Sequence, residues 1–565
     1  MKFSVVAAYF EQIEEIASRN AMVEKLAELF HVSSSTEIGI ICNLALGRLD
    51  PPYIGTTFNI AEKSLVKAVA LFTKQSEQEV GLQLKKIGDI GALFELWPVV
   101  HEESSYDVIH TYSLLKEIAL FSGVGSQEKK VAQLVYLFSC LDVKGRKFAA
   151  RIIVGKLRLG FSDMTLIDAL SWMQVGTKAL KKPIENAYNL CVDIGYIAEA
   201  LKQGGIEAVK TIELTVGIPV RPAAAERINN PEDIVKKIGP CIAQPKLDGF
   251  RVQIHIDTAG EKHRIFFFSR NLQNMSYMFP DLASECLSVA GITCIMEGEA
   301  IAYDEDEGAF LPFQETVKRK RKHGIEKMKE EIPLQLFLFD ILYLNGESLL
   351  VLPHEERRKQ LTSVYALLVQ KSTQKSIKLI EEVTIATAQD LELYFNENIS
   401  MGLEGVVVKR PDASYQPGKR NFNWIKLKRQ QYGHLADTID AVILGYYKGS
   451  GKRASFGIGA FLVGVYDEKR DLFETIAKVG TGLKDQEWKE LKKLCDEHEI
   501  DKKLYNVSCD KNLFPDVWIE PSIVVALSAD EITISPSHTA GKKNGDTTGY
   551  ALRFPRFESY RTDKS

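Results

Sequence analysis

The chain has 565 residues, which is too long for one compact hydrophobic core and indicates about three or four domains. Its composition, 45% hydrophobic and 26% charged, is that of a globular protein, and no apolar run reaches the roughly 18–20 residues of a membrane-spanning helix. The formal net charge of −4 does not indicate a nucleic-acid partner, although a large protein can gather its basic residues on one face.

The first residues and the cysteines exclude two further classes. The apolar stretch that begins at Met1 ends at Phe10 and is followed at once by Glu11, Glu14 and Glu15, which is wrong for a signal peptide. We therefore expect a cytoplasmic protein, or a nuclear one in a eukaryote. The eight cysteines include no Cys-x-x-Cys pair, so we expect free, mostly buried thiols and no zinc site.

Residues 1–215 are expected to be helical. Apolar residues recur every three or four positions in Met1–Phe30, which predicts an amphipathic helix. Similar spacing predicts helices over Tyr106–Ser122, Glu128–Leu141 and Ile184–Gln203. Strand-like alternation is rare in this part of the chain, and no fixed-period repeat stands out.

The pattern changes near Gly217–Pro222, where two prolines and the loss of helical period predict a linker. Short β-rich runs that alternate with helical stretches then predict an α/β or α+β domain over residues 216–430. The strands predicted there are Val252–Ile256, Arg264–Ser269, Cys294–Tyr303, Leu334–Leu344 and Gly405–Lys409.

Residues 431–565 predict a small closed β-barrel, because several short strands are separated by Gly-rich turns. The strands expected are Asp440–Tyr447, Gly459–Tyr466, Leu472–Val479 and Ile523–Ser528, with one helix at Asp485–His498.

The hexapeptide from Lys246 to Arg251, Lys-Leu-Asp-Gly-Phe-Arg, is the most informative segment of the middle domain. One interpretation is an ordinary Asp-Gly turn with flanking charges. The other is a lysine nucleophile. A lysine amine attacks only when unprotonated, so its pKa of about 10.4 must be lowered by desolvation or by nearby cations such as Arg251.

Downstream segments favour the nucleophile. Lys426 and Lys428 lie two apart in a predicted strand and therefore share a face, where a phosphate would relieve their repulsion. Glu299 and Glu404 flank apolar strands, where a carboxylate needs a partner, and a divalent cation that bridges them to phosphate would provide one. Phe339 lies in a very apolar strand, where an aromatic residue is more often part of the core.

These segments occur in the order of the motifs of the covalent nucleotidyltransferase superfamily. Besides the hexapeptide they are Ser269-Arg270-Asn271, Glu297-Gly298-Glu299, Phe339-Asp340, Glu404–Lys409 and Trp424–Lys428. The chain therefore resembles this superfamily of DNA ligases, RNA ligases and mRNA capping enzymes over nearly its whole length. It is most similar to the ATP-dependent DNA ligases of archaeal and eukaryotic type.

The resemblance implies a role for the positions that handle phosphate. Lys246 would form the phosphoramidate with AMP, and Lys426 and Lys428 would hold the α-phosphate. Glu299 would contact the ribose and, together with Glu404, would place the metal cofactor, Mg²⁺ or Mn²⁺.

The resemblance also implies contacts to the nucleoside. Phe339 would stack on adenine, Arg251 and Arg270 would contact the ribose and later the DNA 5′-phosphate, and Arg420 would also contact the nucleotide. Gln244 stands where many relatives have a glutamate that accepts a hydrogen bond from the adenine amino group. A glutamine carbonyl can accept the same bond, and the exchange leaves the use of other donors, such as ADP, GTP or NAD, open.

The end of the chain resembles a further family motif, and one nearby position departs from the family pattern. Arg561 and Lys564 match the last motif, in which they would orient the leaving pyrophosphate; the alternative is a solvated charged tail. Ala526 stands where relatives usually have an acidic residue.

In the helical region, Lys156, Arg158 and Gly160 match the loop with which the family's DNA-binding domain touches the minor groove. The cations would meet phosphates and the glycine would allow a close approach. The basic run Lys318–Lys322 suits a DNA-facing patch or a solvated helix face about equally, with a targeting signal as a third interpretation.

The sequence thus predicts an all-α DNA-binding domain (1–215), an α/β (α+β) adenylation domain (216–430) and an OB-fold domain (431–565). The expected activity is that of a monomeric ligase that uses ATP to seal nicks in double-stranded DNA during replication, repair or recombination. A sliding-clamp partner is left open. The alternatives are an RNA ligase or guanylyltransferase, against which the long helical domain argues, and an inactive DNA-binding relative, against which the intact motif residues argue.

Overall fold

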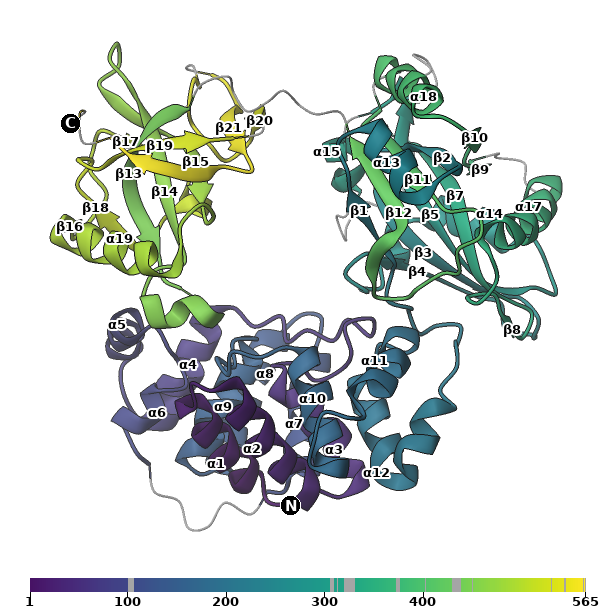
Figure 1. Ribbon diagram of the computed structural model, residues 1–565. Coiled ribbons are helices and arrows are strands. Elements are labelled where there is room, and N and C mark those ends of the chain that lie inside the picture. Colours follow the sequence, from purple (N-terminus) through teal and green to yellow (C-terminus); the bar gives the residue numbers. More distant parts are fainter. Residues whose placement is uncertain are drawn as a thin grey trace. The chain divides into compact units, whose positions relative to one another are not determined.

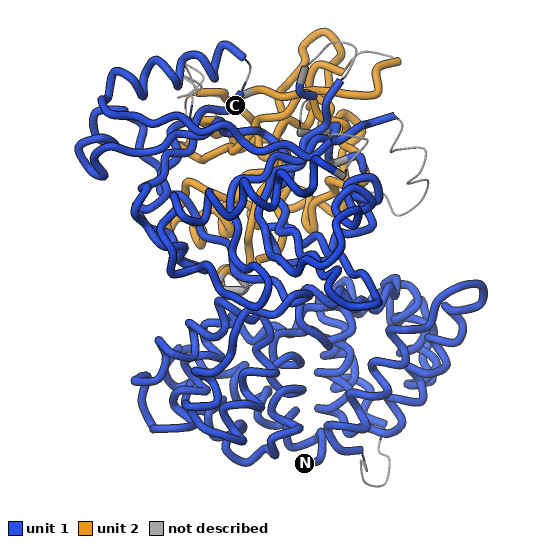
Figure 2. The backbone as a smooth tube through the Cα atoms, turned by 90° about the vertical axis from the view of Figure 1, so that its right-hand side faces the viewer, with its two compact units in different colours: residues 1–428 blue, residues 429–565 orange. Residues whose placement is uncertain are grey.

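The computed structural model describes residues 1–99, 106–304, 309–311, 313–319, 331–371, 376–401, 403–428, 438–449, 451–529, 531–542, 545–561 and 563. Contacts divide the chain into two compact units, Met1–Lys428 and Arg429–Ser565 (Figure 2). The first contains a helical region and two β-sheets, and the second is β-rich (Figure 1). Among the described residues, no helix combines the length and the apolar composition needed to cross a membrane.

The described part of residues 1–210 is built from α-helices around one apolar core. The helices predicted over Tyr106–Ser122 and Glu128–Leu141 are confirmed as α7 and α8. The bounds are Phe3–Glu15 (α1), Arg19–Val32 (α2), Ser35–Ala45 (α3), Glu62–Thr73 (α4), Glu77–Ile87 (α5), Leu93–Leu96 (α6), Val108–Leu120 (α7), Ser126–Ser139 (α8), Val143–Ile153 (α9), Asp163–Val175 (α10), Lys181–Leu190 (α11) and Ile194–Lys210 (α12).

Two of the predicted helices are each broken in two. The single helix predicted over Met1–Phe30 is wrong, because Ile16 is extended (φ −82°, ψ 119°) and the Ser18 side chain caps the first turn of α2. The single helix predicted over Ile184–Gln203 is also wrong, because the Asp193 carboxylate caps the start of α12. Apolar spacing continues across both breaks, since the paired helices bury their apolar residues in the same core.

The middle of the chain forms two sheets. The five-stranded sheet has the order β1-β12-β11-β2-β10, and the seven-stranded sheet has the order β4-β3-β5-β7-β8, with β6 on β5 and β9 on β7. The strand bounds are Ala224–Arg227 (β1), Cys241–Lys246 (β2), Phe250–Asp257 (β3), Arg264–Ser269 (β4), Thr293–Asp304 (β5), Ala309–Phe310 (β6), Leu334–Leu344 (β7), Glu347–Ser348 (β8), Ile377–Leu379 (β9), Val383–Ile385 (β10), Gly405–Lys409 (β11) and Arg420–Lys428 (β12).

All five strands predicted for this domain are present, three of them with the predicted bounds. The strand β2, which ends at Lys246, was not predicted. The helices are Pro231–Ile238 (α13), Ser276–Met278 (η1), Pro280–Cys286 (α14), Phe313–Lys318 (α15), His354–Lys371 (α17) and Ala388–Ser400 (α18).

Helices cover one face of each sheet, and the other face is turned toward the opposite sheet (Figure 1). The outer face of the five-stranded sheet packs against α13 and α18, and that of the seven-stranded sheet packs against α14 and α17. The inner faces meet in an apolar cluster that joins Trp424 of β12 to Ile295 of β5 and Leu342 of β7. Polar side chains on the inner faces beside this cluster therefore lie in the space between the sheets.

The unit Arg429–Ser565 is β-rich, as predicted. Its main sheet has the order β16-β18-β13-β14-β15-β17, and β19 pairs with β13 and β22, while β20 and β21 form a hairpin. The bounds are Ile439–Tyr447 (β13), Gly451–Phe456 (η2), Ala460–Asp467 (β14), Leu472–Val479 (β15), Asp485–Glu497 (α19), Glu499–Ile500 (β16), Val507–Ser508 (β17), Lys511–Leu513 (η3), Val517–Ile519 (β18), Val524–Ser528 (β19), Glu531–Ser535 (β20), Gly549–Arg553 (β21) and Arg556–Tyr560 (β22).

Candidate active site

The five-stranded sheet arranges the candidate nucleotide-binding residues in rows. Pairing across β2, β11 and β12 gives the rows Lys246–Gly405–Lys428 and Gln244–Val407–Lys426. Alternate residues of a strand share a face, so the side chains of both rows, apart from Gly405, which has none, point to the inner face. The prediction that Lys426 and Lys428 share a face is confirmed, and Ile425 and Leu427 point to the opposite face, where both are buried in the outer core.

Glu404, directly before β11, holds the first row together. Its carboxylate accepts hydrogen bonds from the Nζ atoms of both Lys246 and Lys428. Its backbone N–H donates to the carbonyl oxygen of Lys246 at 3.1 Å, which fixes the residue beside the end of β2. The carboxylate thus stands between two ammonium groups that would otherwise repel each other.

The surroundings of Lys246 make its ammonium group easier to deprotonate. Burial lowers the pKa of the Lys246 ammonium below its usual value; Glu299 and Asp248 oppose this shift, and Arg270 and Arg251 add to it. Desolvation is therefore the main cause, and the neighbouring arginines, which the sequence suggested, contribute less. A lowered pKa is what a lysine nucleophile requires.

Further cations gather around Lys426, the inner-face lysine of the second row. Burial lowers the pKa of Lys426, and Arg420, Arg270 and Lys246 lower it further. Each of these groups was a candidate phosphate or nucleotide contact in the sequence. Several cations that disfavour one another's charge make a site that an anion would stabilise.

Glu299 approaches the lysine from the other sheet. It pairs with Arg251 across β3 and β5, and burial raises its pKa to about 7 against the opposing pull of Lys246 and Arg251. Gly249, in the crossover from β2 to β3, allows this approach, since a Cβ there would lie 2.6 Å from the carbonyl oxygen of Ala300. Glu299 and Glu404 thus come near Lys246 from opposite sheets.

The residues near Lys246 could supply a metal ion with only two protein ligands, the carboxylates of Glu299 and Glu404. Within the described ranges, no three His, Cys, Asp or Glu side chains are grouped so as to hold a metal. All eight cysteines are free and six are buried, as the sequence predicted. Mg²⁺ is commonly bound by one or two carboxylates together with substrate phosphates, and the two carboxylates here fit that habit.

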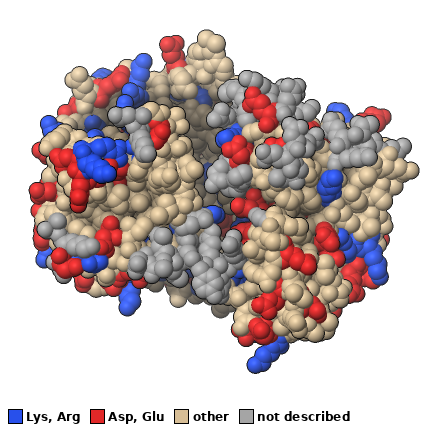
Figure 3. Space-filling model, turned by 90° about the horizontal axis from the view of Figure 1, so that it is seen from above, with Lys and Arg blue, Asp and Glu red and all other residues tan. Residues whose placement is uncertain are grey.

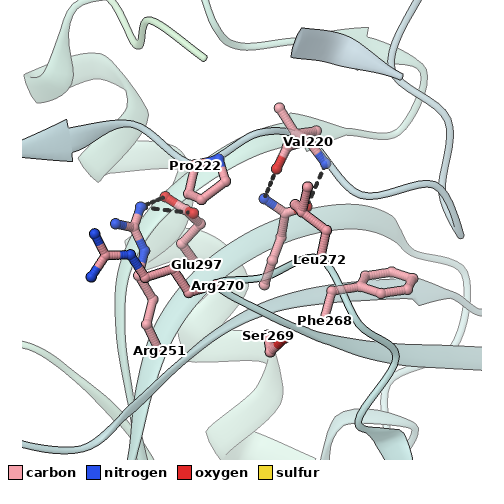
Figure 4. A pocket seen from close by; sticks show the side chains of 9 residues that line it. Val220, Pro222, Arg251, Phe268, Ser269, Arg270, Leu272 and Glu297 are labelled. Carbon is pink, nitrogen blue, oxygen red and sulfur yellow. Dashed lines mark hydrogen bonds and ion pairs between the residues drawn. The ribbon is translucent and has the colours of Figure 1, made fainter. Parts of the chain in front are cut away.

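A pocket with about 210 Å³ of empty space, open solvent included, lies beside these residues between the linker and the strands β3 and β4. Arg251 donates two hydrogen bonds of 2.9 Å to Glu297 and one of 2.9 Å to the carbonyl oxygen of Ala223. Figure 4 shows the Arg251 and Arg270 side chains extending in the same direction beside Glu297. Arg251 is therefore held by a buried carboxylate, whereas Arg270 is exposed.

Phe339 borders the apolar cluster between the sheets rather than lying deep in a core. Its half-buried ring meets Trp424 edge-on at 6.2 Å, and the Arg251 guanidinium lies 5.4 Å from it. Lys409, which was not predicted as a site residue, donates to the carbonyl oxygen of Phe339 at 3.0 Å and lies 5.2 Å from its ring. Burial lowers the pKa of Lys409 to about 8. The sequence held one signal for it: Lys409 lies two residues after Val407 in a predicted strand, so it shares the face of the site residues.

Glu382 and His354 also belong to this region and were not predicted from the sequence. Gln244 is buried and donates to Glu382 at 2.6 Å, and the same carboxylate oxygen lies 2.9 Å from a ring nitrogen of His354. No local motif marks either residue, because the contacts join segments that are far apart in the chain.

The candidate DNA-binding loop follows α9. Leu157 and Leu159 are buried, whereas Lys156, Arg158 and Gly160 alternate with them and are exposed. Arg158 (φ 65°) and Gly160 (φ 73°) have left-handed backbones, and a Cβ at Gly160 would meet no atom within 4 Å. The two leucines anchor the loop and leave the three candidate residues exposed, with the Arg158 guanidinium donating to the carbonyl oxygen of Gly88.

In the second unit, Arg561 binds Asp440 through two contacts of 2.9 and 2.8 Å and also pairs with Asp563. Asp440 pairs with Ala526 across β13 and β19. Position 526 thus lacks the expected carboxylate, and the residue paired with it, Asp440, supplies the one that binds Arg561. Lys564 lies outside the described residues.

The basic run Lys318–Lys322 is not a uniform surface patch. Arg319 is 2% exposed and forms hydrogen bonds of 2.8 and 2.9 Å with Asp281, so the expectation of a surface cation is wrong there. Lys318 is exposed and pairs with Glu315, and residues 320–322 lie outside the described part. On the face in Figure 3, basic and acidic side chains are interspersed rather than separated by sign.

Three successive segments of the chain match models of DNA ligase domains. Residues 222–428 match the family model "ATP dependent DNA ligase domain", residues 2–171 match "DNA ligase N terminus", and residues 454–564 match "ATP dependent DNA ligase C terminal region". The chain is 46% identical over 566 residues to a "Probable DNA ligase" of Dictyoglomus thermophilum, a match that covers 100% of this chain and 95% of that relative.

Other relatives and a solved structure extend the likeness. The "DNA ligase" of Saccharolobus solfataricus is 37% identical over 583 residues, with 100% of this chain and 95% of that protein covered. A solved structure named "Pmar-Lig_PreS3" aligns with 98% of this chain and 99% of its own, with a TM-score of 0.55 and 16% identity. This last likeness concerns the fold alone.

Proposed function

This chain belongs to the family of ATP-dependent DNA ligases, and we propose that Lys246 is the residue that carries AMP in its reaction. The observation that supports the proposal most is the position of the Lys246 amine. It is half-buried between two sheets, its pKa is lowered, and cations that suit a phosphate lie around it.

The proposed reaction has three transfers at phosphorus. The neutral Lys246 amine attacks the α-phosphorus of ATP, a P–N bond forms, the bond to the β-phosphate oxygen breaks, and pyrophosphate leaves. An oxygen of the DNA 5′-phosphate then attacks the AMP phosphorus and displaces the lysine. Finally the 3′-hydroxyl attacks the activated 5′-phosphate, the nick is closed, and AMP leaves. Positioning and charge neutralisation supply most of the catalysis in such transfers.

In this scheme the basic residues on the inner face bind the phosphates. Lys426 and Lys428 hold the α-phosphate, and Arg270 and Arg420 contact the nucleotide from the edges. Arg251 is oriented by Glu297 toward the same pocket. When phosphate enters, it replaces Glu404 as the counter-charge of the two lysines that this carboxylate now binds.

Glu299 and Glu404 are the proposed ligands of Mg²⁺ or Mn²⁺. A divalent ion bound there supplies charge neutralisation at the phosphate oxygens. Glu404 would share its carboxylate between such an ion and the two lysines that it now binds. Phe339 and Gln244 form the proposed adenine site.

We propose three functional domains with the boundaries 1–215, 216–430 and 431–565. The helical domain binds duplex DNA, in part through Lys156, Arg158 and Gly160. The β-rich domain is an OB-fold, in which Arg561 and Lys564 orient pyrophosphate in the first step. The strand content of that unit and the exposure of the loop residues support these assignments.

A gel assay on nicked duplexes tests the proposal. The protein is incubated with ATP and Mg²⁺ and with duplexes that carry a 5′-phosphate nick in either DNA or RNA. Sealing of the DNA nick is expected, and it should be lost in Lys246→Ala but kept in Lys262→Ala, a change of an exposed lysine. Preferential sealing of the RNA nick would contradict the assignment of substrate.

A further inference from the structure

The orientation of the Gln244 side chain is fixed by one neighbour. Its Nε2 donates to Oε1 of Glu382 at 2.6 Å, across 138 residues of sequence, and its side chain is almost fully buried. A glutamine amide can turn so that either its N–H or its carbonyl faces a ligand. Which of the two faces the site therefore depends on what the other end must bind.

Glu382 determines which end of the Gln244 amide faces it. His354 lies 2.9 Å from Oε1 of Glu382, and the Arg358 Nε lies 3.4 Å from Oε2, so donors surround the carboxylate. Burial alone would raise the pKa of Glu382, but His354, Lys409 and Arg358 outweigh it and hold the pKa below its usual range. An ionised carboxylate only accepts hydrogen bonds, so Gln244 must present its N–H to Glu382.

The carbonyl oxygen of Gln244 is then the atom left for a ligand. Gln244 shares the inner face of β2 with Lys246 and lies two residues from it, which is about 7 Å along a strand. That separation suits a nucleotide whose α-phosphate meets Lys246 and whose base lies near Gln244. A base that offers an N–H there gains a hydrogen bond, and a base that offers an oxygen meets a second acceptor.

We propose that Glu382 is a positioning residue that makes Gln244 an obligatory acceptor, so that the site selects purines with an amino group at position 6 over purines with an oxo group there. This inference rests on the proposed use of Lys246 and of the adenine site. It assigns the choice between adenine and guanine or hypoxanthine to a pair of side chains rather than to Gln244 alone.

The test compares ATP with inosine triphosphate, which has an oxo group in place of the 6-amino group. Rates of covalent transfer to the protein are measured without DNA, by intact-mass spectrometry, over a range of nucleotide concentrations. In Glu382→Gln the neighbour can donate as well as accept, so Gln244 can turn. The preference for ATP over inosine triphosphate should fall at least 10-fold in kcat/KM, whereas Glu381→Gln, which changes an exposed neighbour, should leave it unchanged.

Exchange of the two side chains provides the second measurement. Gln244→Glu alone sets two carboxylates face to face and should slow transfer from ATP at least 10-fold. The double variant Gln244→Glu/Glu382→Gln again offers an acceptor to the base and a donor to that acceptor, so it should recover both the rate and the preference. Recovery by exchange distinguishes positioning from a general loss of structure.

The outcomes separate the two proposals. If Glu382→Gln keeps the wild-type preference, or if the double variant is no better than Gln244→Glu, the role of Glu382 is overturned while Lys246 can still be the acceptor of AMP. If Lys246→Ala still takes up nucleotide, the proposed function itself fails, whatever the preference.

Discussion

Lys246 lies directly opposite Gly405 in the antiparallel pairing of β2 with β11, and any side chain in place of this glycine would strain the sheet. Its backbone φ is +141°, in a region that side chains disfavour. A Cβ there would collide with the carbonyl oxygen of Leu427 and would lie 2.9 Å from the Cα of Lys428. The absent side chain lets β11 and β12 pack closely, so that Lys246, Glu404 and Lys428 meet.

Gly405→Ala should therefore separate the two lysines and destabilise the domain. The strained backbone and the clash together are expected to cost about 2 kcal/mol or more of unfolding free energy. The rate of nucleotide transfer should also fall, by a factor that corresponds to a free energy at least as large. Thermal unfolding and labelling by α-labelled ATP provide the two measurements. Gly260→Ala is the control, since a Cβ there meets no atom within 4 Å, and it should behave like the wild type.

The cation cluster around Lys426 predicts the effect of removing one charge. Lys426→Met keeps most of the side-chain volume but removes an ammonium from the proposed phosphate site. The rate of nucleotide transfer at saturating ATP should fall about 100-fold, a typical effect of losing one group that stabilises developing charge. Single-turnover labelling measures this rate. A variant that transfers nucleotide at the wild-type rate would remove Lys426 from the site, and Lys262→Met controls for the loss of a surface charge.

His255 makes the stability of the middle domain depend on pH. The Gly217 N–H donates to its Nδ1 at 3.1 Å, and its Nε2 lies 2.9 Å from the Gln253 carbonyl, so the folded ring is neutral. Burial lowers the pKa of His255 to about 3, well below the value of about 6.5 expected in the unfolded chain. As the pH falls below 6.5, the unfolded state gains a proton that the folded state does not bind, and stability is lost.

Between pH 7 and pH 5 this residue should remove about 2 kcal/mol of unfolding free energy, at about 1.4 kcal/mol per pH unit. His255→Gln should be less stable at pH 7 but should lose less stability than the wild type on acidification. Chemical denaturation at both pH values gives the comparison. His263→Gln, at an exposed position, should keep the wild-type pH dependence, and equal losses in all three proteins would refute the assignment.

The loop after α9 predicts how DNA binding responds to salt. Lys156→Ala and Arg158→Ala should each weaken binding of nicked duplexes to a similar degree for every sequence. Each should also make the slope of log affinity against log salt shallower by about 0.9 if one phosphate contact is lost. Fluorescence anisotropy at several salt concentrations measures both quantities. Lys63→Ala, an exposed lysine of α4, should leave the slope unchanged, and a loop variant with the wild-type slope would take that residue out of the interface.

The sequence predicted those parts of the site whose signal is local. Alternation along β12 placed Lys426 and Lys428 on one face, and the apolar runs located β4, β7 and β11 to the residue. It missed β2, because Gln244-Pro245-Lys246 has no strand-like alternation. It also missed the breaks before α2 and α12, since a cap is a single polar residue within a continuing apolar pattern.

Glu382 and His354 could not be predicted for a different reason. Their effect on Gln244 arises only where β2, the start of α17 and the segment before β10 come together, and 138 residues separate Gln244 from Glu382. Arg319 shows the converse, since a run of basic letters suggested a surface whereas Asp281 draws this residue into the interior. Contacts between distant segments, rather than local pattern, decided these cases.

The most direct test of the account is the site of covalent attachment. The protein and its Lys246→Ala variant are incubated with α-labelled ATP and Mg²⁺ without DNA, and the wild-type product is digested and sequenced by mass spectrometry. The account predicts one AMP on the peptide that contains Lys246 and no label on the variant. Label that persists in Lys246→Ala, or AMP that maps to another residue, would contradict it.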